Sequence, residues 1–592
     1  MNLETIKKEQ IKSQAKQAAL VKQSSLLAML RLVSFFVILL GVYFGYDKKI
    51  QVGYFISIFA IVIFIFLYIE HQKIKNQQIN EECYQEVLLS FKMRRDQTWN
   101  TFKEMGNEFE LDSKSEDLDL IHQASLYQYL SCATTPFGKR KLYEAITIGF
   151  YDVKQLIKKQ NAIKECIEKA SFSIHLQVCL YKMRRLKVIN EEKMNQLLND
   201  LETNKSDISL LYRITSIVLP IIMFIICILV MFFNLNSIYI WILFMIQLLF
   251  SFLYKNNSDD ALASIFLLSQ SLQGYEEIFQ LMQQETFESE ELKSISNCLT
   301  EGSIGIHKLH TFIGFVNVRL SPITYFIFSG LFMVDTHLTR YFNKWCNQYG
   351  NQVRIWVDAI GKMEVYLSLS NLAFSKESTC FPTFVEQEKP VLEMEGLKHP
   401  LIKEAICVDN DYACKHATCI ITGSNMSGKT TFMRSIGVNT ALALAGAPVC
   451  ATRFTLTPMH VYTSMRIVDD VEHGISTFYG EILRIKGIME ASKKQAKMLV
   501  LIDEIFKGTN SADRIIGAKE AIHRLQEDWI LSFVTTHDFE LCALQQDNKM
   551  DIVNQHFNEY YESDGIHFDY KIKEGRCLTT NAKELMKMAG IL

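Results

Sequence analysis

The chain has 592 residues, enough for roughly three or four domains, and a formal net charge of −3. A charge so close to zero gives no overall indication of a nucleic-acid-binding protein. The 14 cysteines form no C-x-x-C pair. This pattern favours reduced core residues in a protein that faces the cytosol over a disulfide framework.

Two apolar stretches, 32–46 and 52–69, lie near the N-terminus and are separated by a short polar turn. The second is long enough to span hydrocarbon, which takes about 20 residues. The first becomes long enough if it begins near Leu26 and the Arg31 side chain extends toward the membrane surface. The pattern predicts a transmembrane hairpin over 26–70, behind a basic tail at 1–25. A buried hairpin of a water-soluble protein is the alternative.

Basic residues predict the orientation of this hairpin. Lysines are enriched on both flanks, so the N-terminus and the chain after the hairpin are both expected in the cytoplasm. Lys48 and Lys49 in the turn argue weakly for the opposite orientation. The flanking lysines are Lys7, Lys8, Lys12, Lys16, Lys22, Lys73 and Lys75.

A second apolar region, 214–254, contains no charged residue and is interrupted at 234–237. Its length fits two spans and a tight turn, so it predicts a second hairpin in the lipid bilayer. A buried hairpin is again the alternative. The shorter apolar stretch 322–334 precedes Asp335 and His337, which favours a buried or interfacial helix.

Residues 423–430 read G-S-N-M-S-G-K-T and match the phosphate-loop pattern G-x-x-x-x-G-K-T. An apolar run at 417–421 predicts a strand before the loop, and 431–444 predicts a helix after it. Backbone N–H groups and the helix N-terminus would favour bound phosphates. Lys429 would reach the β- and γ-phosphates, and the Thr430 hydroxyl would bind Mg²⁺. A chance glycine-rich turn is the alternative.

Two further strands end in residues suited to ATP hydrolysis. The run 498–502 is followed by Asp503 and Glu504, a pair suited to holding Mg²⁺ and polarising the attacking water. The run 531–535 leads to His537, which can contact the γ-phosphate region or have a structural role. Residues 474–478 begin a helix whose N-terminus can bind an anion, although an ordinary N-cap would look the same.

These motifs together resemble the MutS family. Residues 422–430 are similar to its loop T-G-P-N-M-G-G-K-S, and 476–478 read S-T-F. Residues 503–505 with 508–509 resemble D-E-I-x-x-G-T, 536–541 resemble T-H-x-x-E-L, and 398–401 resemble R-H-P-V. The five motifs occur in the family's order over about the last third of the chain. A weaker similarity at 125–142 and 358–373 extends to the family's helical core.

The apolar stretches predict two transmembrane helical hairpins, and the resemblance implies that they are joined to an all-α MutS-like core and a C-terminal α/β P-loop ATPase domain of the ABC type. The expected parts are a basic tail (1–25), hairpin 1 (26–70), a helical linker (71–120), the first half of the core (121–213), hairpin 2 (214–254), the second half of the core (255–385) and the ATPase domain (386–592).

The family's roles carry over to matching positions. The resemblance implies ATP and Mg²⁺ as cofactors and a homodimer with two composite sites, which ATP closes and hydrolysis loosens. Glu504 would be the catalytic base, His537 the switch residue, and Thr430 and Asp503 the Mg²⁺ ligands, while Ser476 would reach the partner's nucleotide. The nucleotide-binding residues implied are Gly423, Ser424, Asn425, Met426, Ser427, Gly428, Lys429, Thr430 and Thr431.

The mismatch-reading domain and the DNA-clamping arms of the family are not recognisable in the sequence. Basic clusters at 92–95, 139–141 and 182–187 can contact nucleic acid, face anionic lipid, or form solvated helix faces. Two hypotheses follow: a membrane-anchored ATPase that binds DNA, as in mismatch repair or DNA-structure sensing, or an ATP-driven motor acting on the membrane. A degenerate scaffold is a third, against which the intact motif residues count.

Overall fold

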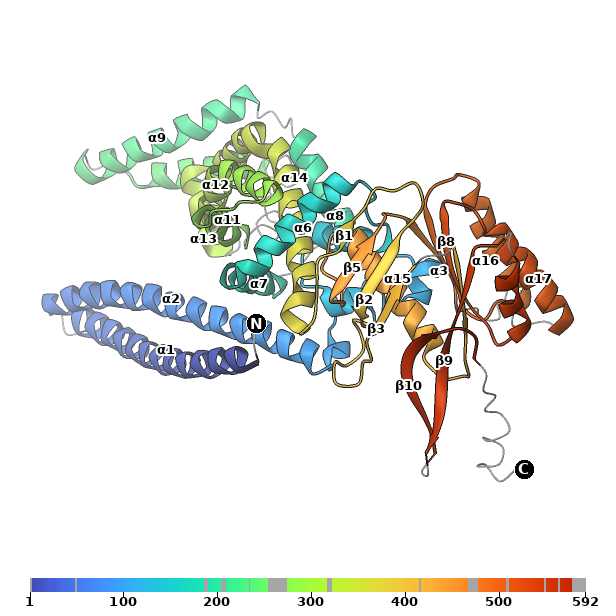
Figure 1. The fold of residues 1–592 in the computed structure, drawn as a ribbon. Helices are drawn as coiled ribbons and strands as arrows, with labels where there is room; N and C mark the ends of the chain where they lie inside the picture. The colour runs from blue at the N-terminus through green and yellow to red at the C-terminus, as the bar shows by residue number, and fades with distance from the viewer. Residues whose placement is uncertain are drawn as a thin grey trace.

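The computed structural model describes residues 3–47, 50–185, 190–203, 209–233, 235–253, 274–316, 322–414, 417–466, 477–506, 511–547, 550–562 and 565–577. These residues form a mostly helical chain that ends in an α/β region (Figure 1). Among the described residues, only helices precede residue 376, and the strands lie after it, with further helices between them.

Helices α1 (Leu3–Tyr46) and α2 (Gln51–Arg95) pack side by side as a long antiparallel pair (Figure 1). Near the turn their backbones approach closely at glycines. A Cβ placed on Gly53 would lie 2.6 Å from the Gly41 carbonyl oxygen and 2.8 Å from the Gly45 nitrogen. Such small-residue crossings are characteristic of helices that associate in membranes, where no hydrophobic driving force acts between them. The N-terminal tail continues the helix of the first apolar stretch from Leu3 onward.

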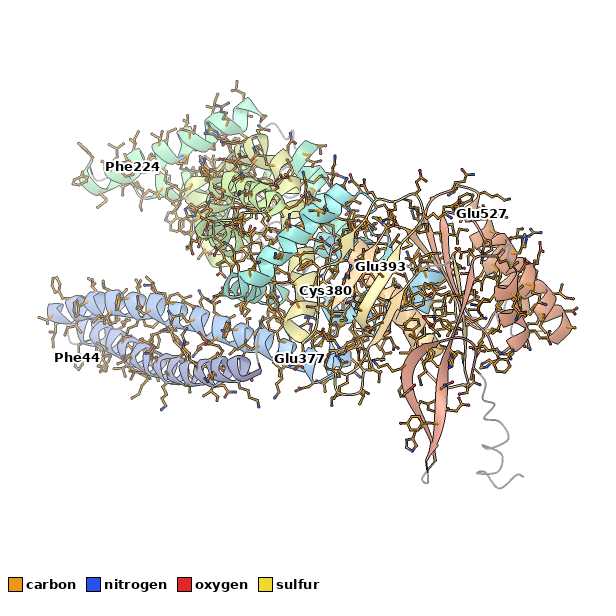
Figure 2. The ribbon with its side chains drawn as sticks, in the orientation of Figure 1. Phe44, Phe224, Glu377, Cys380, Glu393 and Glu527 are labelled. Atoms are coloured by element: carbon orange, nitrogen blue, oxygen red, sulfur yellow. The ribbon has the colours of Figure 1, made fainter. Side chains whose placement is uncertain are left out.

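Among the described residues, three helices are long and apolar enough to cross a membrane, judged by length and composition: Lys7–Tyr46, Val52–Arg95 and Leu210–Phe233. The last is α9, and a shorter apolar helix, Ile238–Leu253, follows it. Their apolar side chains are largely exposed; Phe44 on α1 and Phe224 on α9 are 45% and 68% exposed (Figure 2). Exposed apolar surface of this extent is unusual for a protein surrounded by water.

The far end of α2 is anchored in the helical core by Arg94, which is 1% exposed. Its Nε donates to the Tyr129 carbonyl (2.6 Å) and its Nη2 to the Ser131 carbonyl (3.1 Å). The guanidinium also lies 4.9 Å from the ring centre of Phe102. Because α2 is one continuous helix, its exposed apolar half and the core are mechanically connected.

The core is organised around α14 (Val334–Ser375), most of whose central and C-terminal residues are buried. It contacts α2, α9 and the majority of the core helices. The other helices before the sheets are α3 (Ser113–Asp117), α4 (Leu126–Leu130), α5 (Pro136–Thr147), α6 (Val153–Glu168), α7 (Ala170–Arg184), α8 (Glu191–Thr203), α11 (Tyr275–Gln284), α12 (Glu290–Val316) and α13 (Pro322–Phe332).

At its N-terminal end α14 makes a hydrogen bond to the apolar helix α9, at a carbonyl that a proline leaves without a helical partner. Pro220 has no N–H, so the Ser216 carbonyl one turn earlier loses its helical partner. His337 Nε2 on α14 lies 3.0 Å from this carbonyl oxygen. The apolar helix α13 packs beside both elements, with Phe326 and Phe332 about half exposed, consistent with the interfacial helix expected at 322–334.

Buried Glu364 on α14 binds the T-P-x-G run at 135–138, which begins α5. Its carboxylate accepts from the backbone N–H and the hydroxyl of both Thr134 and Thr135, and Thr135 also caps α5 through the Gly138 N–H. Burial raises the pKa of the Glu364 carboxyl, and these hydrogen bonds oppose that shift. Gly138 is required because a Cβ there would overlap the Glu364 carboxylate.

Gly138→Ala is therefore expected to destabilise the core by about 1–3 kcal/mol, the usual cost of forced overpacking. Thermal unfolding followed by circular dichroism measures this effect. The matched control is Gly487→Ala in helix α16 (Thr477–Ser492). An added Cβ there meets no atom within 4 Å, and alanine improves helix propensity by up to about 1 kcal/mol. Equal melting temperatures for the two variants would contradict the assigned role of Gly138.

Two sheets form the C-terminal region. A six-stranded sheet has the order β10-β9-β4-β8-β7-β6, and only β10 is antiparallel to its neighbour. A four-stranded sheet has the order β1-β5-β2-β3. The strands are β1 (Thr383–Phe384), β2 (Leu392–Leu397), β3 (Asn410–Ala413), β4 (Thr418–Thr422), β5 (Arg453–Leu456), β6 (His460–Ser464), β7 (Met498–Ile502), β8 (Ile530–Thr535), β9 (Ile552–Glu562) and β10 (Gly565–Glu574).

Helices α15 (Lys429–Leu444), α16 (Thr477–Ser492) and α17 (Ser511–Arg524) and the 3₁₀ segment η3 (Phe539–Gln546) connect the strands. The central strands β4, β7 and β8 are buried at every residue, as their largely apolar sequences predict for a parallel sheet covered on both faces. In such a sheet the carboxyl ends of neighbouring strands converge on one edge, where ligands usually bind.

Candidate functional site

The loop between β4 and α15 has the backbone geometry that its glycines allow. Gly423 and Gly428 have φ values of 149° and 106°, in the region that favours glycine, and Met426 has φ 71°. Helix α15 begins at Lys429, directly after the loop. The first N–H groups of that helix therefore point toward the loop, which is a geometry suited to an anion.

Lys429 bends back over the loop. Its Nζ donates to the carbonyl oxygens of Gly423 and Ser424, each at 2.8 Å. Burial lowers the pKa of its ammonium, while the nearby carboxylates of Glu504 and Asp503 oppose the shift. The positive charge is thus held at the phosphate loop and close to both acidic residues.

Asp503, at the end of β7, is held between two hydroxyls. Thr430 donates to Oδ2 at 2.7 Å, and Thr535, at the end of β8, donates to Oδ1 at 2.5 Å. The hydroxyl that follows the glycine-rich loop and the carboxylate that follows β7 thus meet. Thr535 also accepts from the Glu504 N–H at 2.8 Å, so one hydroxyl fixes both acidic residues.

Glu504 and His537 lie next to each other. Glu504 Oε1 is 3.1 Å from His537 Nε2, and Glu504 has a left-handed φ of 53°. The turn after β8 is held by Arg514, whose Nε and Nη2 each donate to Asp538 at 2.7 Å. Glu504 and His537 lie at the same edge of the sheet as the phosphate loop.

The oxygen ligands at this edge fit Mg²⁺. The Thr430 hydroxyl and the Asp503 carboxylate are hard donors, and Mg²⁺ typically takes one or two protein carboxylates together with substrate phosphates and waters. Within the described ranges, no group of three or more His, Cys, Asp or Glu residues could hold a metal ion. This donor set therefore suits a metal that arrives with a nucleotide.

The remaining predicted residues are distributed as follows. Met426 is 85% exposed and the Ser427 hydroxyl is buried within the loop. Asn425 lies at the exposed tip, and Thr431 is in the first turn of α15. Ser476, expected to act on the partner's nucleotide, lies outside the described residues.

Three residues of the site were not predicted from the sequence. Thr535 could have been found, because it directly precedes the T-H motif at a strand end. Glu559 on β9 accepts from the Ser424 hydroxyl at 2.8 Å, and Tyr570 on β10 lies 3.1 Å from the position of a Cβ on Gly428. Both come from the distant β9–β10 hairpin, and no local pattern links that hairpin to the loop. The Tyr570 ring can contact a nucleotide held by the loop.

Carboxylates of the same chain neutralise much of the three basic clusters. Lys139 and Arg184 both pair with Glu104, at 2.5 and 3.2 Å, and Arg185 pairs with Glu82 and Glu86. Further ion pairs join Arg95 to Glu377, Arg140 to Glu191, Lys141 to Asp358 and Lys182 to Glu277. These clusters therefore present less free positive charge than the sequence suggests.

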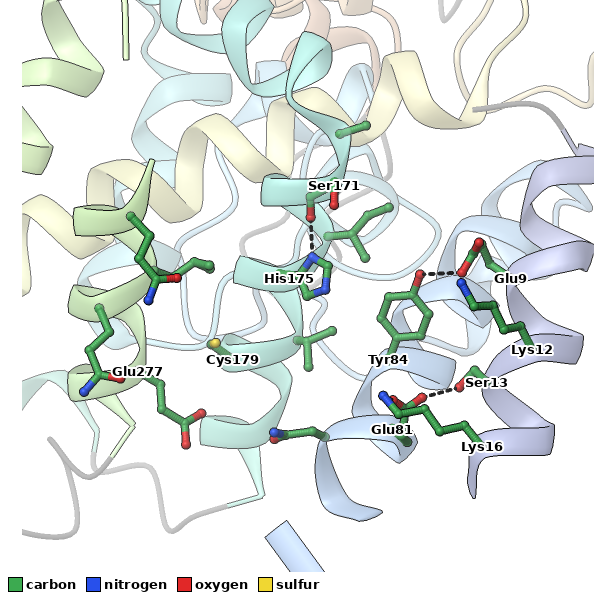
Figure 3. Close-up of a pocket in the computed structure, with 17 residues that line it drawn as sticks. Glu9, Lys12, Ser13, Lys16, Glu81, Tyr84, Ser171, His175, Cys179 and Glu277 are labelled. Carbon is green, nitrogen blue, oxygen red and sulfur yellow. Dashed lines mark hydrogen bonds and ion pairs between the residues drawn. The ribbon is translucent and has the colours of Figure 1, made fainter. Parts of the chain in front are cut away.

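A cavity of about 730 Å³ lies between the N-terminal helix pair and the core (Figure 3). Figure 3 shows Tyr84 on α2 directed at Glu9 of α1, with a hydrogen bond of 3.4 Å, and His175 of α7 facing the same space. Lys16 pairs with Glu81 at its wall, and Lys12, Glu9 and Glu277 also line it. The mixed charges favour no single class of ligand.

The described residues thus define a mostly helical protein with a C-terminal α/β domain, and at one edge of its parallel sheet a glycine-rich loop, two carboxylates and a histidine converge. Residues 419–591 match the family model for MutS domain V. The chain is also similar to the mismatch repair proteins described next.

The chain is 32% identical over 239 residues to the DNA mismatch repair protein MutS of Aquifex pyrophilus, covering 39% of this chain and 27% of the relative. It is 31% identical over 214 residues to DNA mismatch repair protein MutS 2 of Halobacterium salinarum, covering 34% and 24%. For MutS of Natronomonas pharaonis the values are 28% over 239 residues, with 39% and 27% covered. The matched part spans about a quarter of each relative's length.

Proposed function

We propose that the protein is an ATPase that binds Mg²⁺–ATP at the edge of the six-stranded sheet. The observation that carries this proposal is the placement of Thr430 against Asp503 at 2.7 Å beside Glu504 and His537. The phosphate loop and Lys429 would hold the β- and γ-phosphates. Mg²⁺ would neutralise charge developing on the phosphates during transfer to water.

In this proposal Glu504 orients the attacking water and accepts its proton. The Glu504 N–H donates to the Thr535 hydroxyl, and the Glu504 carboxylate contacts His537. The residue is thus held in place and needs little rearrangement before the reaction. His537 contacts that carboxylate and can respond to the state of the γ-phosphate. The motif at 476–478 would complete the site of a second subunit, which makes a homodimer the proposed active form.

The proposed location is the membrane. The apolar helices α1, α2 and α9 would cross the bilayer, together with Ile238–Leu253, while the N-terminus, the core and the sheets remain in the cytoplasm, where ATP is available. The glycine contacts near the turn between α1 and α2 support this proposal, because they bring the two backbones close together.

DNA is the first candidate for what ATP hydrolysis controls, because the matched relatives are named as DNA mismatch repair proteins. The second candidate function is an ATP-driven motor that acts on the membrane. A specific observation favours it: α2 runs unbroken from its apolar half to the buried Arg94, so movements of the core would reach the membrane helices. The internal pairing of the basic clusters also favours it over DNA.

ATP hydrolysis by purified, detergent-solubilised protein decides between these candidates. The assay is run without DNA and with duplex, mismatched and branched DNA, and then in lipid vesicles, with Glu504→Ala as the inactive control. Stimulation by one DNA structure supports the DNA-coupled function. Turnover that ignores every DNA but changes with lipid supports the membrane motor. Absence of turnover under all conditions contradicts the proposed ATPase.

A further inference from the structure

A buried carboxylate far from the phosphate loop in sequence contacts the sheet domain. Asp117, at the end of α3, is fully buried. Its oxygens accept from the backbone N–H of Met465 (3.1 Å) and of Arg466 (2.8 Å), and from Arg484 Nη1 at 3.0 and 3.1 Å. Figure 1 shows α3 lying against the sheet domain, apart from the membrane-type helices.

The two backbone groups that Asp117 binds adjoin the residue that supports Asp503. The Ser464 carbonyl, at the end of β6, accepts from the Asp503 N–H at 2.9 Å. Asp117 binds the next residue, Met465, so the two aspartates are linked through neighbouring positions of one chain segment. The Asp503 side chain in turn binds Thr430. A shift of the end of β6 would therefore move the proposed Mg²⁺ ligands.

Asp119, two residues later, contacts the phosphate-loop helix itself. It has a left-handed φ of 51° and accepts from Arg434 at 3.1 Å and from Arg466 at 2.6 Å. Arg434 lies one helical turn after Thr430 on α15. The segment 117–119 thus supports Asp503 through the end of β6 and Thr430 through helix α15.

The position of the end of β6 depends on the negative charge of Asp117. A fully buried carboxylate is costly unless it is paired and hydrogen-bonded, and Asp117 has four donor contacts that meet this need. Removing its charge would leave Arg484, whose side chain is 20% exposed, without its closest carboxylate. The end of β6 would then lose its fixed position.

We propose that Asp117 is a positioning residue for ATP hydrolysis. It fixes the end of β6 so that Asp503 and Thr430 face each other, and it connects the nucleotide site to the segment that leads from α2. This inference rests on the proposed ATPase function. Asp117 touches neither nucleotide nor metal, so its effect is expected on the geometry around Mg²⁺ rather than on ATP binding by the phosphate loop.

The test is Asp117→Asn in the full-length detergent-solubilised protein, with turnover measured against ATP and against Mg²⁺ concentration. Residues that orient metal ligands typically contribute about 10- to 100-fold to activity or metal affinity, so kcat is expected to fall and the half-saturating Mg²⁺ concentration to rise in that range. The KM for ATP at saturating Mg²⁺ is expected to stay within about twofold, because Lys429 and the loop are untouched.

The matched control is Asp112→Ala, because asparagine would still cap the helix. Asp112 caps the same short helix by accepting from the Ser115 N–H at 2.8 Å, so this variant perturbs α3 without removing the contacts of Asp117. Its kcat and Mg²⁺ dependence should remain close to those of the wild type. If both variants lose activity equally with the same Mg²⁺ dependence, general loosening of α3 explains the result and the positioning role is overturned.

A second variant covers the case in which Asp117→Asn does not fold, as judged by thermal unfolding. Arg484→Gln removes only the ion pair and leaves both backbone hydrogen bonds, so a smaller shift in the same direction is expected. If the wild type is active and a folded Asp117 or Arg484 variant has the same Mg²⁺ dependence, the positioning role of Asp117 is overturned and the proposed ATPase function stands. A wild type without Mg²⁺-dependent turnover overturns the proposed function and this inference with it.

Discussion

Glu504→Gln is expected to reduce ATP turnover by about 10²- to 10⁴-fold, the usual contribution of a positioned general base. Glutamine preserves the size of the side chain and its contact with His537, but it cannot accept the proton of the attacking water. ATP binding should persist because Lys429 and the loop do not depend on this carboxylate. Phosphate release and the binding of a fluorescent ATP analogue measure the two effects separately.

The same variant also tests the proposed dimer. A subunit that binds ATP without hydrolysing it should remain in the ATP-closed state, so Glu504→Gln should show more dimer with ATP than with ADP in size-exclusion chromatography. Glu520→Gln is the matched control: Glu520 pairs with Arg524 on the exposed surface of α17, where one ion pair has little effect. Wild-type turnover by Glu504→Gln would exclude Glu504 as the base.

The sequence identified the phosphate-loop region because the necessary information is local. The apolar run 498–502 coincides with β7, and the largely apolar run 531–535 falls within β8, since near-continuous apolar sequences are typical of a parallel strand covered on both faces. The acidic pair and His537 follow these strands directly, so strand order alone brings them to one edge. The meeting of Thr430 with Asp503 follows from the same arrangement.

Features that depend on distant partners could not be predicted in this way. Asp117 and Arg466 are 349 positions apart, and nothing near either residue indicates the other. Lys139 and Arg184 appear in the sequence as free basic residues, but both pair with Glu104 after folding. The length of α2 was also not predicted: the apolar run ends at residue 69, whereas the helix continues to Arg95, because contacts with α7 and the core support its polar half.

The proposed membrane location leads to a prediction with opposite outcomes for α2 in lipid and for α2 in water. Phe55, Phe59 and Val62 are 71%, 68% and 60% exposed on this helix. If they face lipid, replacing all three by lysine costs roughly 8–10 kcal/mol, taking about 2.5–3.5 kcal/mol for each charge near the bilayer centre. The triple variant should then fail to insert α2 and be degraded, so its level in the pellet after alkaline extraction should fall, as measured by immunoblotting.

If the same helix faces water, the triple lysine variant should behave in the opposite way. Replacing exposed aromatic and aliphatic residues by lysine would reduce the apolar patch and raise the yield of soluble protein. Leu89→Lys is the control, because Leu89 is 47% exposed on the same helix beyond the apolar stretch and should tolerate a charge in either environment. Retention of the wild type in the pellet and loss of the triple variant, with Leu89→Lys retained, can arise only if the apolar half of α2 is in the bilayer while its polar half is not.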